Sequence, residues 1–318
     1  MEIRFWGTRG SLPASLTARD IREKIRCALE IALEKDLTRK SDIDAFIDRE
    51  LPFWVRATYG TNTPCLEIRK GEEFILCDAG TGLRDFGNRY VLSRGLDSPG
   101  DFHVFLTHFH WDHIQGFPFF PPAHLQGNRI TIYGCHKEME KALSEQQRLP
   151  FFPVDFKELP ARIDFVVLEP DHWYDVCGFR VFGKEQNHPG LSYGYRFERD
   201  GKSVVYATDV EPQFENDDEA QPYLDFLHQA DLLIFDAQYS FLETSTIKEN
   251  WGHSNNLLGV ELAKRAKVKH LCLYHNEPLT ADKDLDKLLA DTQKIAALLM
   301  EGEALKVSVA WDGWRVEL

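Results

Sequence analysis

Cysteine pairs, long apolar runs and an excess of basic residues are all missing from this chain of 318 residues. The six cysteines are scattered and none forms a Cys-x-x-Cys pair, so we expect no disulfide framework in a chain of this size. No stretch approaches the roughly eighteen apolar residues that a membrane span requires. The chain opens without a basic region followed by an apolar stretch. We therefore expect a cytoplasmic protein that does not enter membranes.

The charge balance is acidic, with a formal net charge of −14. A protein that binds duplex nucleic acid usually carries a basic stripe, and none is visible here, so we expect no stable nucleic-acid complex. Bound metal ions can supply positive charge locally, which leaves a small anionic substrate open. The length allows a sizeable core, and no linker, low-complexity tract or short repeat divides the chain.

One stretch of the sequence gathers imidazole and carboxylate groups: His108, His110, Asp112 and His113 fall within six residues. The apolar residues 102–106 before it predict a buried strand, and a proline at position 118 allows only a short helical turn after it. In an extended turn the first two histidines point the same way and can hold one cation. The other two residues then point to a neighbouring position. The spacing favours two adjacent metal sites, and the alternative is a histidine-rich surface loop.

Further polar groups stand where other apolar runs end. A carboxylate follows residues 203–208, a histidine follows residues 270–274, and His188 lies in a loop before a strand, with His172 as its alternative. Residues 231–236 also end in a carboxylate, to which the sequence assigns no role. Five imidazoles and two carboxylates suit zinc, or else manganese or iron. The predicted ligands are His108, His110, Asp112, His113, His188, Asp209 and His275.

The pattern His-x-His-x-Asp-His after a strand resembles the metal-binding motif of the metallo-β-lactamase superfamily, and the resemblance extends over most of the chain. It implies one metal held by His108, His110 and His188, and a second held by Asp112, His113 and His275. Asp209 would bridge the two ions. The resemblance also implies that Asp78 supports the metal loop, that a hydroxide between the metals attacks the substrate, and that Asp112 is catalytic as well as a ligand.

The sequence Gly252-His253-Ser254 precedes a predicted helix, whose N-terminus favours an anion. It resembles the His-Ser-Thr element of the phosphodiesterase branches, which include the tRNA 3′-processing endonucleases, although Asn255 replaces the threonine. In those enzymes the histidine contacts phosphate and protonates the leaving oxygen, so we assign a catalytic role to His253. An ordinary helix-capping loop is the alternative.

Two other stretches indicate which phosphodiesterases of this superfamily the chain resembles most. Residues 5–13 (FWGTRGSLP) and 59–67 (YGTNTPCLE) resemble small bacterial phosphodiesterases that act on cyclic nucleotides or cyclic phosphates. The glycine-rich basic arm of the tRNA-processing enzymes is not visible. We therefore predict a metal-dependent hydrolase of a small, cyclic nucleotide or related phosphodiester. The alternatives are a hydrolase of thioesters, lactones or other acyl substrates, and a nucleotide-binding module without turnover.

For the fold, we expect an α/β (α+β) protein with a four-layer αββα sandwich in a single domain over residues 1–318. Helical spacing in the charged region between the first two strands predicts a helical insertion over about residues 15–56. That insertion is a brace or lid, a homodimer contact, or a wall of the substrate pocket. The aromatic and proline-rich loops 117–122 and 149–154 either line a pocket for a planar ring or pack against the core.

Overall fold

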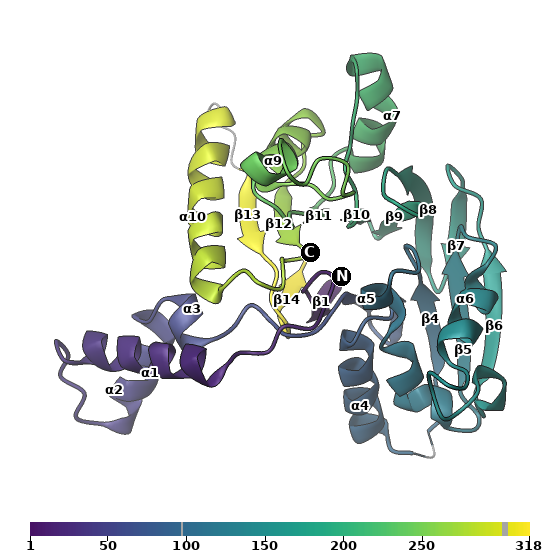
Figure 1. Ribbon diagram of the computed structural model, residues 1–318, viewed down its shortest axis with the longest axis horizontal. Helices are drawn as coiled ribbons and strands as arrows, with labels where there is room; N and C mark the ends of the chain where they lie inside the picture. Colours follow the sequence, from purple (N-terminus) through teal and green to yellow (C-terminus); the bar gives the residue numbers. More distant parts are fainter. Residues whose placement is uncertain (97, 301–304) are drawn as a thin grey trace.

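Two seven-stranded sheets lie face to face in the computed structural model, which describes residues 1–96, 98–300 and 305–318. Helices cover the outer faces: α4 lies against the first sheet, and α9 and α10 lie against the second (Figure 1). The predicted αββα sandwich is therefore confirmed. No helix in the described part of the chain is both long and apolar enough to cross a membrane.

The first sheet has the strand order β14-β1-β2-β3-β4-β5-β6. Its early strands pair antiparallel, and β3 to β6 pair parallel. Side chains alternate across β1, where Ile3 and Phe5 are fully buried between the sheets while Arg4 points to the outer face. The strands are β1 (Glu2–Gly7), β2 (Cys65–Lys70), β3 (Glu73–Cys77), β4 (Asp101–Phe105), β5 (Arg129–Gly134), β6 (Arg162–Val167) and β14 (Arg315–Glu317).

The second sheet has the order β13-β12-β11-β10-β9-β8-β7. Its strands β10 to β13 are parallel, and every residue of β11 and β12 is buried, because sheet covers one face and helices cover the other. The strands are β7 (Trp173–Val176), β8 (Phe179–Gln186), β9 (Ser192–Arg199), β10 (Lys202–Ala207), β11 (Leu232–Asp236), β12 (His270–Tyr274) and β13 (Lys306–Val309).

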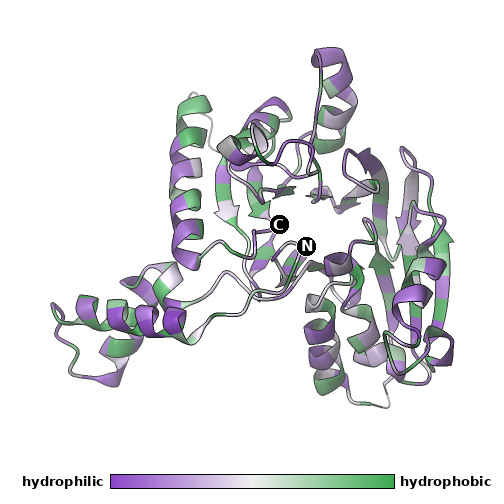
Figure 2. Ribbon diagram, viewed as in Figure 1, coloured by the Kyte–Doolittle hydropathy of each residue, from purple (hydrophilic) through white to green (hydrophobic). Residues whose placement is uncertain are grey.

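The helices are amphipathic, and both hydropathy colours alternate along α10 in Figure 2. The α-helices are α1 (Ala18–Ala32), α2 (Lys40–Arg49), α3 (Phe53–Arg56), α4 (Gly82–Arg94), α5 (Trp111–Ile114), α6 (Met139–Gln146), α7 (Asp217–Leu227), α8 (Phe241–Thr244), α9 (Asn256–Arg265) and α10 (Asp282–Leu299). The 3-10 helices are η1 (Phe117–Phe119), η2 (Pro121–His124) and η3 (Phe156–Glu158).

Helices α1 to α3 lie between β1 and β2 in the sequence and project away from the sandwich (Figure 1). Lys24 on α1 fastens them, because its ammonium donates to the carbonyl of Ala57 at 2.8 Å, to Asp282 at 2.7 Å and to the carbonyl of Trp54. The residue Asp282 opens α10, so the projecting helices are tied to the second sheet's outer layer.

The aromatic loop 117–122 packs mainly inward, whereas most of the loop 149–154 is exposed. Phe117 and Phe120 are buried in the core between the first sheet and its helices. Phe119 and Phe151 are exposed, and the ring of Phe119 contacts that of Phe152 at 5.3 Å between centroids. Packing against the core therefore accounts for the two buried phenylalanines, while the contact between Phe119 and the half-buried Phe152 joins the two loops.

Candidate metal centre

Several parallel strands end in a polar side chain at the same edge of the sandwich. Asp78 follows β3, Asp209 follows β10 and His275 follows β12. All three have positive φ angles, of 61°, 54° and 62°. A left-handed backbone costs a non-glycine residue roughly 1 kcal/mol or more, and such residues gather at functional sites. Each strand is thus stopped where its last side chain turns into the space between the sheets.

The first predicted subsite brings together ligand atoms of His108, His110 and His188, all within 4.8 Å of one another. His188 Nε2 lies 3.1 Å from His110 Nδ1. The other ring nitrogen of His188 donates to the carbonyl of Gly252 at 2.7 Å, which leaves the lone pair of Nε2 facing the cluster. His108 Nε2 is buried and has no hydrogen-bond partner among the described residues. Imidazole nitrogens that converge in this way fit a divalent cation.

The second predicted subsite holds Asp112, His113 and His275. Asp112 Oδ2 lies 3.3 Å from His113 Nε2 and 3.1 Å from His275 Nε2. The outer nitrogens are fixed from behind: His113 Nδ1 lies 2.8 Å from Asp78 Oδ2, and His275 Nδ1 lies 2.8 Å from Gln238 Oε1. Such partners orient metal-binding imidazoles. Asp78 therefore lies where a residue that supports the metal loop is expected.

Asp209 stands between the two groups with one oxygen toward each. Its Oδ1 lies 3.8 Å from Nε2 of both His108 and His188. Its Oδ2 lies 3.2 Å from His113 Nε2 and 3.4 Å from His275 Nε2. This is the arrangement that a carboxylate bridging two cations needs.

The protonation states of the first subsite suit a metal. Burial, followed by the neighbouring imidazole of His113, lowers the pKa of His108 well below its usual value. Burial also lowers the pKa values of His110 and His188. These imidazoles are therefore neutral at pH 7, which is the form that binds a metal ion.

The second subsite carries a concentration of negative charge. Burial favours the neutral acids, but the surrounding histidines, His113 first, hold the pKa values of Asp112 and Asp209 well below their usual range. Conversely, burial opposes charge on His113, yet Asp209, Asp112 and Asp78 raise its pKa well above its usual value. The carboxylates thus demand a positive charge beside them, which a divalent cation would supply in place of that proton.

His253 lies beside both subsites. Its ring centroid is 5.1 Å from those of His188 and His275, and its Nδ1 donates to Asp236 Oδ2 at 2.8 Å. Burial alone would lower the pKa of His253, but Asp236, with Asp209 and Asp112, raises it to about 9. Cations in the neighbouring subsites would bring this pKa back toward neutrality, where a general acid works best.

The loop around His253 is shaped for this position. Gly252 has φ +84°, and a Cβ there would lie 2.3 Å from His188 Nδ1, so only glycine fits. Glu211 accepts the backbone N–H of Gly252 at 2.8 Å. Asn255 caps α9 by accepting the N–H groups of Leu257 and Leu258, which is the capping alternative raised from sequence; it coexists with the placement of His253 at the centre.

All seven residues predicted as ligands therefore converge, together with His253, while their binding of metal stays a prediction. His172 lies outside the cluster, exposed and bonded to the carbonyl of Pro170. Asp236 was missed as a site residue, although its strand ends in a carboxylate just as the strand before Asp209 does. Gln238 was missed because an amide in a loop gives no pattern. Ser11, whose N–H donates to Asp112 at 2.7 Å, was missed for the same reason.

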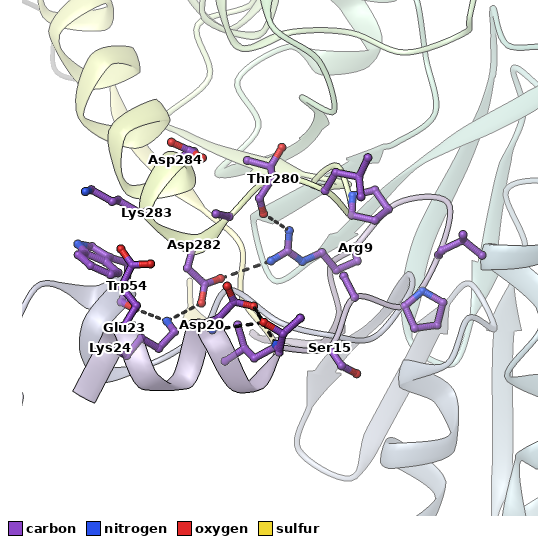
Figure 3. Close-up of a pocket in the computed structure, with 18 residues that line it drawn as sticks. Arg9, Ser15, Asp20, Glu23, Lys24, Trp54, Thr280, Asp282, Lys283 and Asp284 are labelled. Atoms are coloured by element: carbon purple, nitrogen blue, oxygen red, sulfur yellow. Dashed lines mark hydrogen bonds and ion pairs between the residues drawn. The ribbon is translucent and has the colours of Figure 1, made fainter. Parts of the chain in front are cut away.

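A hollow of about 560 Å³ lies between α1 and the start of α10 (Figure 3). Arg9 reaches into it, but its guanidinium is already bonded to the carbonyls of Glu277 and Thr280 and to Asp282. Leu12, Trp54 and Leu279 give the hollow an apolar wall. The projecting helices therefore form one side of this cavity, and the chain that lines it continues through Leu12 to Ser11, whose N–H donates to Asp112.

Comparisons with known proteins agree with this geometry. A family model described as the beta-lactamase superfamily domain matches residues 73–276. The ribonuclease Z of Thermoplasma acidophilum is 26% identical over 241 residues, which cover 60% of this chain and 73% of that protein. The ribonuclease Z of Pyrococcus furiosus is 27% identical over 272 residues, 70% of this chain and 83% of that protein.

Solved structures share the fold along the whole chain. YhfI of Bacillus subtilis, a metallo-beta-lactamase fold protein, has a TM-score of 0.63 at 19% identity, covering 100% of this chain and 98% of that one. A diphosphatase from the PhnP family has a TM-score of 0.60 at 17% identity, covering 100% of this chain and 97% of that one. The chain belongs to the metallo-β-lactamase superfamily of metal-dependent hydrolases.

Proposed function

We propose that this protein is a phosphodiesterase whose substrate is a small nucleotide-like phosphodiester, with a cyclic nucleotide as the leading candidate. The observation that carries the proposal is the hydrogen bond of 2.8 Å from His253 Nδ1 to Asp236 Oδ2 beside the predicted metal subsites. Hydrolysis of a thioester does not need a proton donor as strongly, because a thiolate departs without one. An alkoxide leaving from phosphorus does need one.

His253 is suited to give that proton. Because Nδ1 is engaged with Asp236, Nε2 is the nitrogen left to protonate a leaving oxygen. The carboxylate also keeps the imidazolium form populated, by the charge effect on its pKa described above. When bound, two divalent cations would supply an activated water and neutralise charge on the phosphate, and the donor set of imidazoles and carboxylates favours zinc, then manganese or iron.

Exposed tryptophans support a substrate that carries a planar base. Trp111 is 77% exposed and Trp251 is 53% exposed, and each is adjacent or close in sequence to a site residue, Asp112 or His253. Exposed indole rings beside a polar centre are suited to stack on a nucleobase. The ammonium of Lys248 lies 3.8 Å from the centroid of the Trp251 ring, which adds a positive charge near that platform.

The names of the similar proteins, ribonuclease Z and diphosphatase, both refer to the chemistry of phosphate esters or anhydrides. These names do not distinguish a small phosphodiester substrate from a large one. The net charge of −14 favours the small one, because a long polyanion is attracted by a positive surface.

The test compares substrates and variants of the metal-loaded protein. Turnover is measured on bis(p-nitrophenyl) phosphate, on 2′,3′- and 3′,5′-cyclic nucleotides, on a thioester and on a precursor tRNA. We expect His253→Ala to lower hydrolysis of the cyclic nucleotides about 10²- to 10⁴-fold with metal content unchanged. The loss on bis(p-nitrophenyl) phosphate should be smaller, since nitrophenolate leaves without a proton.

His172→Ala is the matched control, since this exposed histidine lies outside the centre and should be silent. Normal turnover of cyclic nucleotides by His253→Ala would reject the role of His253. Preference for the thioester, cleavage of the tRNA alone, or binding of a cyclic nucleotide without turnover would each reject the proposed substrate class.

A further inference from the structure

A second concentration of charge lies on the outer face of the first sheet, away from the metal centre. There, α4 and the strands β1 and β2 line a cavity of about 250 Å³. Its charged lining consists of four arginines and two glutamates, and none of these residues belongs to the metal centre. The lining residues that matter are Glu2, Arg4, Glu67, Arg69, Arg89 and Arg94.

Two of the arginines that line the cavity form no ion pair with the described residues. Arg4 and Arg89 have neither an ion pair nor a hydrogen bond among the described residues, and Arg4 Nε is buried without a partner. In the sheet register Arg4 stands directly opposite Arg315 on β14 and directly opposite Glu67 on β2. Like charges directly opposite each other destabilise a sheet unless something neutralises them.

The nearby carboxylates are already used. Glu67 accepts from the indole of Trp6 at 2.9 Å and from Arg69 at 2.6 Å, and Arg94 is paired with Glu72 outside the cavity. Of the two carboxylates that line the cavity, Glu2 is the one that forms no ion pair with the described residues. Burial, then Arg315 and Arg89, lowers the pKa of Arg4, which agrees with an excess of positive charge at this point.

We propose that this cavity binds a small tetrahedral oxyanion, a phosphate group, between the guanidinium groups of Arg4 and Arg89. Arg4 is held in place with its guanidinium carbon 4.0 Å from the centroid of the Trp6 ring, so its donors are preorganised. Guanidinium donors match the oxygens of phosphate in pairs and bind them through charge-assisted hydrogen bonds. The volume admits a phosphate group but is below the range typical of sites that enclose a whole drug-sized ligand.

The ligand is therefore inorganic phosphate or the terminal phosphate of a larger molecule whose remainder stays outside. Isothermal titration of the metal-loaded protein with inorganic phosphate tests the proposal, and adenosine monophosphate distinguishes the two sources. Because the metal centre also attracts phosphate, variants must separate the two sites. We expect the wild-type protein to bind phosphate at two classes of site, the metal centre and the cavity, with a Kd of about 1 mM or lower for the cavity. The affinity of the cavity should be at least about 10-fold weaker in Arg89→Gln and in Arg4→Gln.

Arg129→Gln is the matched control, since Arg129 is paired with Asp164 on the same sheet and lines no part of the cavity. It should retain both classes of phosphate binding. All three variants should keep wild-type turnover of bis(p-nitrophenyl) phosphate, which also shows that they fold. Tighter binding of adenosine monophosphate than of phosphate would identify a nucleotide as the source. Identical phosphate binding by wild type, Arg4→Gln and Arg89→Gln would overturn the proposal, whatever becomes of the proposed phosphodiesterase activity.

Discussion

The carboxylate of Asp236 is hydrogen-bonded to His253 Nδ1 at 2.8 Å, and the same oxygen accepts the backbone N–H of Asp209 at 3.0 Å. Its other oxygen accepts the N–H of Ser254 at 3.2 Å. One fully buried side chain at the end of β11 thus fixes both the proposed proton donor and the proposed bridging ligand. The relative position of the two groups is set by the sheet and does not depend on the mobility of a surface loop.

Asp236→Asn should separate positioning from metal binding. The amide oxygen can still accept the backbone N–H groups of Gln238 and Ser254, but the NH2 group that replaces the other oxygen no longer stabilises an imidazolium at His253. We expect kcat for cyclic nucleotide hydrolysis to fall about 10²-fold. Because Asp236 raises the pKa of His253, its loss should also move the basic limb of the pH–rate profile to lower pH. Asp225→Asn, at an exposed position of α7, serves as the control. An unchanged pH profile with lowered kcat would show that Asp236 is only structural.

Asp209→Asn should affect both metal subsites at once. An amide carries no charge to neutralise two cations, so metal content after dialysis should fall by at least one ion per chain, as measured by plasma mass spectrometry. Asp78→Asn is the comparison, because Asp78 contacts Nδ1 of His113 and not the Nε2 atom that faces the subsite. This substitution should weaken metal affinity about 10- to 100-fold without abolishing binding. Full metal content in Asp209→Asn would exclude a bridging role.

Lys24 is predicted to hold the projecting helices to the body. Its side chain is 13% exposed and its partner Asp282 is 2% exposed, so water screens the pair little. We expect Lys24→Met to cost about 2 kcal/mol in the free energy of unfolding, because buried acceptors lose their donor. Cleavage within residues 18–56 should also quicken in limited proteolysis. Lys35→Met removes an exposed pair with Glu50, between two loops of the same helical insertion, and should change neither measurement appreciably. Equal effects of the two variants would contradict the bridge.

His270 is predicted to make stability depend on pH. Burial, then Lys306, lowers the pKa of His270 to about 4, whereas the unfolded chain titrates near its ordinary value of 6.5. The unfolded state therefore binds more protons between these values, and stability is lost as the pH falls through this window. The difference between pH 8 and pH 5 amounts to about 2 kcal/mol.

His270→Gln should remove that component, since glutamine does not titrate and can still reach Ser308, which lies 2.8 Å from His270 Nε2. Urea denaturation of both proteins at pH 8, 6.5 and 5 gives the difference directly. The wild type should lose about 2 kcal/mol more than the variant by pH 5. Parallel losses in the two proteins would show that His270 does not titrate in this range.

Much of the fold and of the centre could be predicted from sequence because the chemistry sits at strand ends. Apolar runs mark the strands, and a polar residue that follows such a run, as Asp209 and His275 do, lies at a common edge of the sheets. The same rule applies to Asp236, but the sequence predicts no role for it because the partner of a strand-end carboxylate is not visible in the sequence. Its role appears only when β10 and β11 are placed side by side.

Other features could not be found from the sequence because they depend on contacts between distant segments. Gln238 meets His275, and Ser11 meets Asp112, only after the chain has folded. The opposition of Arg4 and Arg315 requires the register of the last strand against the first, which are separated by almost the whole chain. Spacing likewise predicted helices between β1 and β2, but where they attach is seen only in contacts such as those of Lys24 with Asp282 and of Trp54 with Asp286.

The central claim is that two metal ions occupy the space between these strand ends. Crystals of the protein grown with zinc or manganese, measured at the absorption edge of the metal, test it most directly. The account predicts two anomalous peaks, one among His108, His110 and His188 and one among Asp112, His113 and His275, with Asp209 between them. No peak, or a single ion bound elsewhere on the chain, would contradict it.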